Sequence, residues 1–270
     1  MPSLVARDLG YAKQRRHVQE VSQVLETRGV LKVTLDFHDE GSQYLRDLMY
    51  SLHGNHGHGL PISHSASRGW FWDVRPSSSM FQSQNHQARS ETMEDFPWHT
   101  DCSYEASPPR FFGLQVLQPD RQGGGTLSLM HVEELVRLLS PTSVAALLKP
   151  HYRIVTPQEF SKGSGSACHI IGSIFATDNA GRATMMRFRE DITTPLSDEA
   201  YGALKELKRT LLGLEMQQKI IHLTPEFLPK GSIVLIDNYR WLHARNQVRD
   251  PKRHLRRVRW DAAAFPAAIR

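Results

Sequence analysis

A mainly β fold with flanking helices (α+β), arranged as a β-sandwich or jelly roll, is the fold class that the sequence predicts. Short runs of β-branched, aromatic and aliphatic residues recur from residue 110 almost to the end of the chain. Helical spacing of apolar residues is confined to the N-terminal part, residues 1–55, and to two later insertions. Many short strands with helices kept to the ends and insertions are typical of layered β folds. The 270 residues suffice for a single domain with a full core.

The N-terminal part is predicted to contain two helices and one strand. The first helix covers 12–28 and ends at Gly29, a strand covers 30–35, and the second helix covers 40–52. A Gly- and His-rich loop follows, and then a short strand at 70–74. Residues 75–97 have no regular periodicity, and within them 76–97 are interpreted as a lid over a binding site.

The remaining segments alternate between predicted strands and two helices. The strands are expected at 110–118, 125–132, 151–155, 183–188, 218–223, 232–237 and 256–261. One helix is expected over 132–148, broken near Pro141. The other covers 197–214, with Ser197 as its N-cap.

Composition excludes several classes of protein. Hydrophobic residues are 40% and charged residues 23% of the chain, which is ordinary for a soluble globular protein. A net charge of +5 does not by itself indicate nucleic acid. The two cysteines, Cys102 and Cys168, form no disulfide framework and fit a reducing compartment. With no apolar run long enough for a bilayer and no secretory leader, we expect a cytoplasmic protein without a membrane partner.

A His-x-Asp pair is the first candidate metal motif. An open-sided iron(II) site needs two imidazoles and one carboxylate, and residues i and i+2 of a strand point to the same side. Three pairs of this kind occur: His38 with Glu40, His99 with Asp101, and His131 with Glu133. The first lies at a polar helix start and the third at a strand-to-helix junction, where a surface role suffices. His99 and Asp101 lie between the irregular segment and the strand series, where the mouth of a barrel is expected.

The second half of the candidate site lies near the end of the chain. An apolar strand at 232–237 is followed by a polar turn at Asp237-Asn238 and by a strand that carries His243. An arginine-rich strand comes next, from Arg253 to Arg259. An arginine facing the same cavity as the histidine would bind a carboxylate of an anionic co-substrate with its planar fork.

Four segments resemble the taurine dioxygenase and clavaminate synthase-like (TauD/TfdA) family of Fe(II)/2-oxoglutarate dioxygenases. WHTDCSYE resembles the family's His-x-Asp segment, and GGGT at 123–126 its Gly-Gly-x-Thr segment. DNYRWLHAR resembles the segment with the distal histidine, and 253–257 its Arg-x₃-Arg. The segments occur in family order across about 160 residues. The resemblance implies a double-stranded β-helix (jelly roll) core and an iron-, 2-oxoglutarate- and O₂-dependent oxidation that releases succinate and CO₂.

The resemblance also assigns roles to individual residues. It makes His99, Asp101 and His243 the iron ligands and catalytic centre. It pairs the 5-carboxylate of 2-oxoglutarate with Arg253 and with the hydroxyl of Thr126. Arg257 would support the co-substrate or meet the substrate. The residues leave Arg256 open as a rival for Arg253, although strand alternation puts 253, 255 and 257 on one face and 256 on the other.

The substrate is expected to be a small polar molecule, with a carboxylate as one option. The segments before the His-x-Asp pair would supply its contacts, and the candidates are Trp70, Trp72, Arg75, Gln84 and Arg89. The alternative for the Trp70–Trp72 segment is a half-buried strand. Arg187 and Arg189 are either surface residues or contacts at the mouth of the site. Hydroxylation is the default reaction, while desaturation, cyclisation, epoxidation and the oligomeric state stay open.

Four alternative interpretations compete with this hypothesis. The basic tract at 249–259 is compatible with nucleic-acid binding, but strand alternation divides its charges between two faces. The histidines at 53, 56, 58 and 64 could hold a second metal, but no cysteine or carboxylate completes a tetrahedral set. The fold could also serve a non-catalytic binding protein or an oxygenase that acts on a macromolecule. Iron-dependent consumption of 2-oxoglutarate separates an enzyme from a binding protein.

Overall fold

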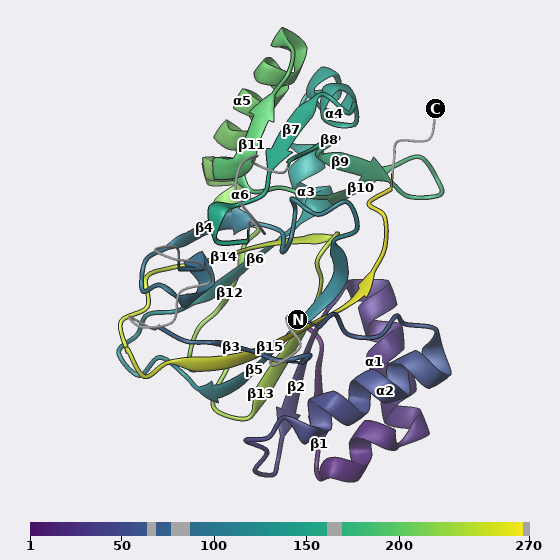
Figure 1. The fold of residues 1–270 in the computed structure, drawn as a ribbon, viewed down its shortest axis with the longest axis vertical. Helices are drawn as coiled ribbons and strands as arrows, with labels where there is room; N and C mark the ends of the chain where they lie inside the picture. The colour runs from purple at the N-terminus through teal and green to yellow at the C-terminus, as the bar shows by residue number, and fades with distance from the viewer. Residues whose placement is uncertain (64–68, 77–86, 161–168, 267–270) are drawn as a thin grey trace.

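The computed structural model describes residues 1–63, 69–76, 87–160 and 169–266, and two β-sheets form its framework (Figure 1). The six-stranded sheet has the order β1-β2-β13-β5-β15-β3, and the four-stranded sheet has the order β12-β6-β14-β4. The larger sheet consists of β1 (Ser3–Ala6), β2 (Val30–Leu35), β13 (Ser232–Asp237), β5 (Pro109–Gln118), β15 (His254–Ala262) and β3 (Trp72–Val74). The smaller sheet consists of β12 (Ile221–Leu223), β6 (Leu127–His131), β14 (Trp241–Arg245) and β4 (Phe96–His99).

Side chains from both sheets pack against one another in a shared interior. Phe112 and Leu114 of β5 belong to the same buried cluster as Leu129 of β6 and Trp241 of β14. Neighbouring strands are antiparallel in both sheets, except that β1 and β2 are parallel. The inward faces of the sheets are therefore apolar, and any polar side chain among them has to be explained by a partner or a function.

Two helices cover the other face of the larger sheet, as Figure 1 shows. They are α1 (Arg15–Arg28) and α2 (Gln43–His56), and the turn η1 (Leu9–Lys13) precedes them. Leu25 of α1 and Leu48 of α2 pack with Leu235 of β13. Helix α1 ends at Gly29, where φ is 68° and an added Cβ would lie 2.9 Å from Nε1 of Trp241. Within the described ranges, no helix has the length and apolar character needed to cross a membrane.

A third group of elements lies between β6 and β12 in sequence and packs beside the smaller sheet. It consists of α3 (Val132–Arg137), α4 (Pro141–Leu147), β7 (Tyr152–Val155), β8 (His169–Gly172), β9 (Phe175–Thr177), β10 (Ala183–Met186), β11 (Thr193–Pro195), α5 (Asp198–Leu212) and α6 (Leu214–Gln217). Two short turns, η3 (Gln158–Phe160) and η4 (Glu190–Ile192), belong to the same group. A further turn, η2 (Arg89–Glu91), precedes β4. Leu204 and Leu207 of α5 pack with Tyr152 of β7 and Leu242 of β14. This cluster joins the third group to the strand that carries His243.

The α+β class predicted from the sequence is confirmed, and the differences concern short elements. The predicted helix at 12–28 is interrupted at Gln14, whose backbone is extended with ψ at 116°. Strand β4 begins at the end of the segment 75–97, for which no regular structure was predicted. Strands β8, β9 and β11 are only three or four residues long. Such strands depend on pairing with distant partners, so local periodicity does not reveal them.

Candidate metal centre

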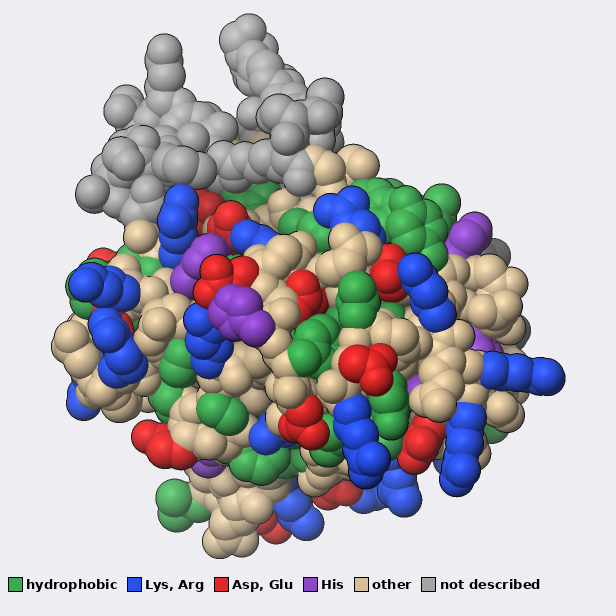
Figure 2. Space-filling model, turned by 90° about the horizontal axis from the view of Figure 1, so that it is seen from below, with side chains coloured by type: hydrophobic (Ala, Val, Ile, Leu, Met, Phe, Trp, Pro, Cys, Tyr) green, Lys and Arg blue, Asp and Glu red, His purple; other side chains and the backbone are tan. Residues whose placement is uncertain are grey.

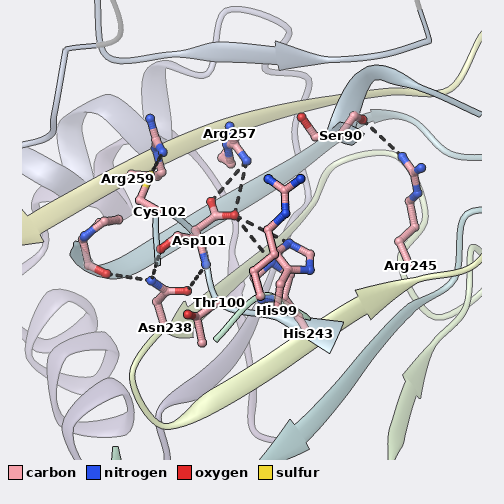
Figure 3. Close-up of polar contacts among 12 residues, drawn as sticks. Ser90, His99, Thr100, Asp101, Cys102, Asn238, His243, Arg245, Arg257 and Arg259 are labelled. Carbon is pink, nitrogen blue, oxygen red and sulfur yellow. Dashed lines mark hydrogen bonds and ion pairs between the residues drawn. The ribbon is translucent and has the colours of Figure 1, made fainter. Parts of the chain in front are cut away.

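His99, Asp101 and His243 meet between the two sheets. His99 is the last residue of β4 and is the pairing partner of His243 in β14. One potential ligand atom from each of the three residues lies within 4.8 Å of the others. Their exposed fractions are 4%, 6% and 6%, so the cluster is almost fully buried. The side chains converge on a common point in Figure 3.

Asp101 is held by the backbone of a turn and not by a strand. The i, i+2 strand geometry that made the His-x-Asp pair a candidate does not apply here, because β4 ends at His99. The side-chain oxygen of Asn238 accepts a hydrogen bond from the Asp101 amide at 2.7 Å. The side-chain nitrogen of Asn238 donates to the carbonyls of Asp101 (3.0 Å) and Pro109 (2.9 Å). Thr100 pairs with Phe188 through its backbone and its hydroxyl. These bonds orient the Asp101 carboxylate toward the two imidazoles (Figure 3).

The charges around the cluster favour the protonation states that a divalent cation requires. Burial alone would raise the pKa of the Asp101 carboxyl, but Arg257 and His243 hold it well below its ordinary value. The Arg257 guanidinium donates to both carboxylate oxygens, at 3.1 and 3.5 Å. Burial and then the charge of His243 lower the pKa of His99 well below its usual range. An ionised carboxylate beside a neutral imidazole is a state ready to bind a metal.

The tautomer and orientation of His99 are set by its neighbours. Its Nδ1 lies 2.7 Å from the carbonyl of Pro97, which selects the tautomer that donates there. The Phe96 ring stacks on the imidazole at 3.6 Å between centroids. Nε2 is therefore left as the acceptor on the side of Asp101. Two imidazole nitrogens and one carboxylate on one side, with cavities on the other, match the donor set of an open iron(II) site.

Two cavities meet at this cluster. We call the first the arginine cavity, because Arg245 and Arg253 line it together with apolar residues such as Leu114 and Leu255. We call the second the aromatic cavity, because Tyr104 and Phe160 line it. Both cavities are lined by Ser90, Phe96, His99, Asp101 and Arg257. A metal bound to the cluster would therefore face both spaces.

The arginine cavity contains a buried cation that forms no ion pair with a described residue, although the charge of Asp120 partly offsets its burial. Arg253 is 5% exposed, and its Nη1 has no hydrogen-bond partner among the described residues. Burial, followed by the charge of Arg245, lowers the pKa of Arg253 to about 9. The only carboxylate among the described lining residues is Asp101, which Arg257 already pairs. This apolar space therefore suits an anionic ligand, as a dicarboxylate co-substrate would be.

A glycine-rich turn positions Arg253. Gly125 has φ at 66°, and a Cβ there would lie 2.7 Å from Nε of Arg253. The buried Asp120 carboxylate accepts hydrogen bonds from the backbone amides of Arg249 and Asp250. These bonds hold the glycine-rich turn against the turn that precedes Arg253. Thr126 is bonded through its amide to Asn246 and is not among the lining residues of the arginine cavity.

Arg256 points to the opposite face of β15. Its Nε donates to Asp73 at 2.8 Å, and its Nη1 donates to the carbonyl of Glu40 at 2.7 Å. Arg257, one residue further, lines both cavities instead. The two faces of the arginine-rich strand therefore have different surroundings, and Arg256 does not reach the cluster.

Most residues that line the aromatic cavity were not predicted as site residues from the sequence. The rings of Tyr104 and Phe160 stack with centroids 5.6 Å apart. Nη1 of Arg189 lies 3.8 Å from Oε1 of Glu159, and both residues line the aromatic cavity. Arg259 lines this cavity as well. Tyr104 could have been suspected, since it follows Asp101 by three residues. Nothing in the local sequence indicates that 159–160, nearly 60 residues later, return to the site.

The predicted substrate contacts are dispersed. Arg89 lines the aromatic cavity, with an ion pair to Asp191 at 3.6 Å. Trp72 is buried, donates to Glu91 at 2.8 Å and lies against Arg257, outside both linings. Trp70 packs on Tyr50 of α2, which fits the half-buried alternative.

Other predicted contacts fall elsewhere. Arg75 is exposed and lines neither cavity, whereas Gln84 and residues 77–86 of the proposed lid (76–97) lie outside the described residues. Arg187 lies over Phe265, away from the cavities. The other candidate metal motifs do not assemble, since His99, Asp101 and His243 form the one group of three potential ligands among the described residues. His64 lies outside them.

The comparisons with known proteins agree with this site. Residues 5–259 match the family "Taurine catabolism dioxygenase TauD, TfdA family". None of the curated proteins compared with the chain matches it. An asparagine oxygenase in complex with Fe(II), 2S,3S-3-hydroxyasparagine and succinate superimposes with a TM-score of 0.73 at 16% identity, over 96% of this chain and 93% of that chain. The non-haem iron oxygenase OrfP in complex with Fe, succinate and (3S)-hydroxy-L-Arg superimposes with a TM-score of 0.66 at 15% identity, over 98% of this chain and 95% of that chain.

The family match spans nearly the whole chain and shows membership. The chain belongs to the TauD/TfdA family, and the resemblance noted in the sequence is confirmed. It is accordingly a 2-oxoglutarate-dependent non-haem iron dioxygenase. The structural neighbours, all far below 25% identity, show the shared fold.

Proposed function

We propose that the enzyme hydroxylates a small polar molecule bearing a carboxylate, with His99, Asp101 and His243 as the iron ligands. The observation that carries the proposal is that His99 and Asp101 line two cavities of different character, and His243 lines the arginine cavity beside them. The arginine cavity suits 2-oxoglutarate, and the aromatic cavity suits the substrate. A metal at their junction would contact both ligands at once, as an oxidation coupled between them requires.

Each residue has a physical task in this scheme. Arg253 would pair with the 5-carboxylate of 2-oxoglutarate, with Thr126 as a second donor. Arg257 holds Asp101 ionised and in place. When iron and 2-oxoglutarate are bound, O₂ oxidises a substrate C–H bond and succinate and CO₂ are released. Tyr104 and Phe160 would exclude water from the reacting bond.

The charges of the aromatic cavity support a substrate with an anionic group. Among the described residues, four arginines line it, at 89, 189, 257 and 259, and two carboxylates do, Asp101 and Glu159. The structural neighbours were solved with hydroxylated asparagine and arginine. An amino acid is therefore the first substrate class to test, with its carboxylate toward the arginines and its ammonium toward Glu159.

The fold and cellular setting belong to the same proposal. We interpret the two facing sheets as a double-stranded β-helix core within a single domain. Cys102 is a free, buried cysteine, which agrees with a reducing cytoplasm.

A macromolecular substrate is less well supported. Arg256 of the basic tract is already paired with Asp73, and Arg121 with Asp250. On the face in Figure 2, basic and acidic side chains are interspersed, without a continuous basic patch. Both observations favour a small molecule over nucleic acid.

A screen for succinate formation tests the proposal. The protein would be loaded with Fe(II) anaerobically and supplied with 2-oxoglutarate, O₂ and a panel of amino acids and other small carboxylates. We expect at least one of them to stimulate succinate formation above the uncoupled rate, and His99→Ala to abolish the stimulation. If 2-oxoglutarate neither binds nor is consumed, a non-catalytic binding protein replaces this proposal.

A further inference from the structure

Arg245 is a buried cation that the proposed mechanism does not use. It lies on β14, two residues after His243, and is 7% exposed. Its Nη1 donates to the carbonyl of Ser90 at 3.1 Å, and its Nη2 donates to the carbonyl of Glu94 (Figure 3 draws the bond to Ser90). Its Nε is buried without a hydrogen-bond partner among the described residues. Carbonyl groups do not neutralise a guanidinium, so the charge of Arg245 is not compensated by these bonds.

Arg245 shares the arginine cavity with Arg253. Both side chains line this space, and each has a buried nitrogen without a hydrogen-bond partner in the described part of the chain. Two like charges in one apolar cavity repel each other, and a carboxylate placed between them would relieve the repulsion. The resemblance assigns Arg253, Thr126 and, as one option, Arg257 to the co-substrate, and it gives the Arg245 guanidinium no role.

The bonds of Arg245 also reach the wall of the aromatic cavity. Ser90, whose carbonyl it binds, lines both cavities. Glu94, the other acceptor, lies two residues before β4, the strand that ends at His99. One guanidinium is thus in contact with the arginine cavity and with the segment 90–94 that borders the aromatic cavity.

We propose that Arg245 is a second binding residue for the distal carboxylate of 2-oxoglutarate and that it transmits co-substrate binding to segment 90–94. This inference rests on the proposed function, because it takes 2-oxoglutarate to be the ligand of the arginine cavity. Binding of the carboxylate between Arg245 and Arg253 holds the Arg245 guanidinium in place. The segment bonded to it is then ordered before the substrate enters.

A comparison of two ligands and three variants tests the direct contact. Calorimetric titration of the metal-loaded, anaerobic protein would use 2-oxoglutarate and 2-oxopentanoate, which lacks the distal carboxylate. Arg245→Met should weaken 2-oxoglutarate roughly 10- to 100-fold and 2-oxopentanoate by less than about threefold. Arg245→Lys should fall between Arg245→Met and wild type. Arg256→Met, on the other face of β15, is the matched control and should leave both affinities unchanged.

Hydrogen exchange of the wild-type protein tests the transmission and does not depend on a folded variant. We expect 2-oxoglutarate, but not 2-oxopentanoate, to slow exchange of the amides in 90–94. Equal exchange with both ligands, or equal losses of affinity for both in Arg245→Met, would overturn the inference. Wild-type protein that binds no 2-oxoglutarate would overturn the proposed function as well. Normal wild-type binding that Arg245→Met leaves intact would overturn the role of Arg245 alone.

Discussion

The metal end and the arginine end of the site lie between the same two sheets, yet their buried charges are balanced in different ways. At the metal end, Arg257 pairs with Asp101, and Asn238 fixes the backbone. At the arginine end, Arg245 and Arg253 are buried without a carboxylate partner among the described residues. A buried charge that is not paired costs free energy.

The difference indicates that the two ends are prepared to different degrees. The metal end is organised by the protein itself, so iron enters a site whose ligands already have their geometry and charge. Under the proposed function, a bound anion would supply the charge partner that the arginine end lacks. The protein therefore trades stability for affinity at the arginine end, as many binding sites do.

The largest expected effect is the loss of a metal ligand. His99→Ala or His243→Ala should lower turnover by more than the roughly 10- to 100-fold that changes around a metal site usually cause. Thermal unfolding should change little, because neither histidine belongs to the apolar clusters. The control is His222→Ala, an exposed histidine on β12 bonded to Ser128. Near wild-type activity of either variant after anaerobic iron loading would remove that residue from the ligand set.

The next effect concerns the arginine end. Arg253→Leu leaves the distal carboxylate without its main partner, which costs roughly 3–5 kcal/mol. Each 1.4 kcal/mol is about tenfold in Kd, so calorimetry should show 2-oxoglutarate affinity lowered by two orders of magnitude or more. Arg256→Leu, whose partners are Asp73 and the carbonyl of Glu40, should cost much less. The reverse ranking would place the co-substrate on the other face of β15.

A smaller effect is expected from the glycine turn that positions Arg253. In Gly125→Ala the new methyl group would lie 2.7 Å from Nε of Arg253 and displace it, so we expect about tenfold weaker 2-oxoglutarate binding. Gly181→Ala is the control, because Gly181 also has a positive φ (75°) but no atom within 4 Å of an added Cβ. Both variants should lose about 1 kcal/mol of stability through backbone strain. Equal 2-oxoglutarate affinities in the two variants would show that the turn does not set the position of Arg253.

The smallest effect is a dependence of stability on pH. Burial lowers the pKa of Arg253 from 12.5 to about 9, so between these values the unfolded chain binds the proton more tightly than the folded chain. The free energy of unfolding should therefore gain a positive contribution as the pH rises above about 9, and Arg253→Leu should lack it. Urea unfolding at pH 8, 9 and 10 without co-substrate measures this difference. Parallel pH dependences in the two proteins would mean that Arg253 has a counter-ion in the folded state.

Much of the site could be predicted because its residues lie in short sequence motifs. His99 and Asp101 are two residues apart, and Arg253 and Arg257 are four apart on a strand that its alternation reveals. Strand alternation, a local property, separated the face of Arg257 from that of Arg256, and the structure shows them on different faces. The α+β class followed from the same kind of pattern, because apolar periodicity reports which face of an element is buried.

Other features were decided only by the tertiary structure. The sequence placed Asp101 between the irregular segment and the strands, but the side-chain amide of Asn238, 137 residues away, holds it in a turn. Trp70 was a candidate for the wall of the substrate pocket, but its ring packs on Tyr50 of α2. Phe160 reaches the site through a long insertion, and Arg245 acquires its bonds to 90–94 only when β14 pairs with β4. Sequence by itself determined which chemistry the chain carries, since that depends on residue types at short spacing. The fold alone decided which distant side chains surround that chemistry, because contacts across a hundred residues leave no local periodicity.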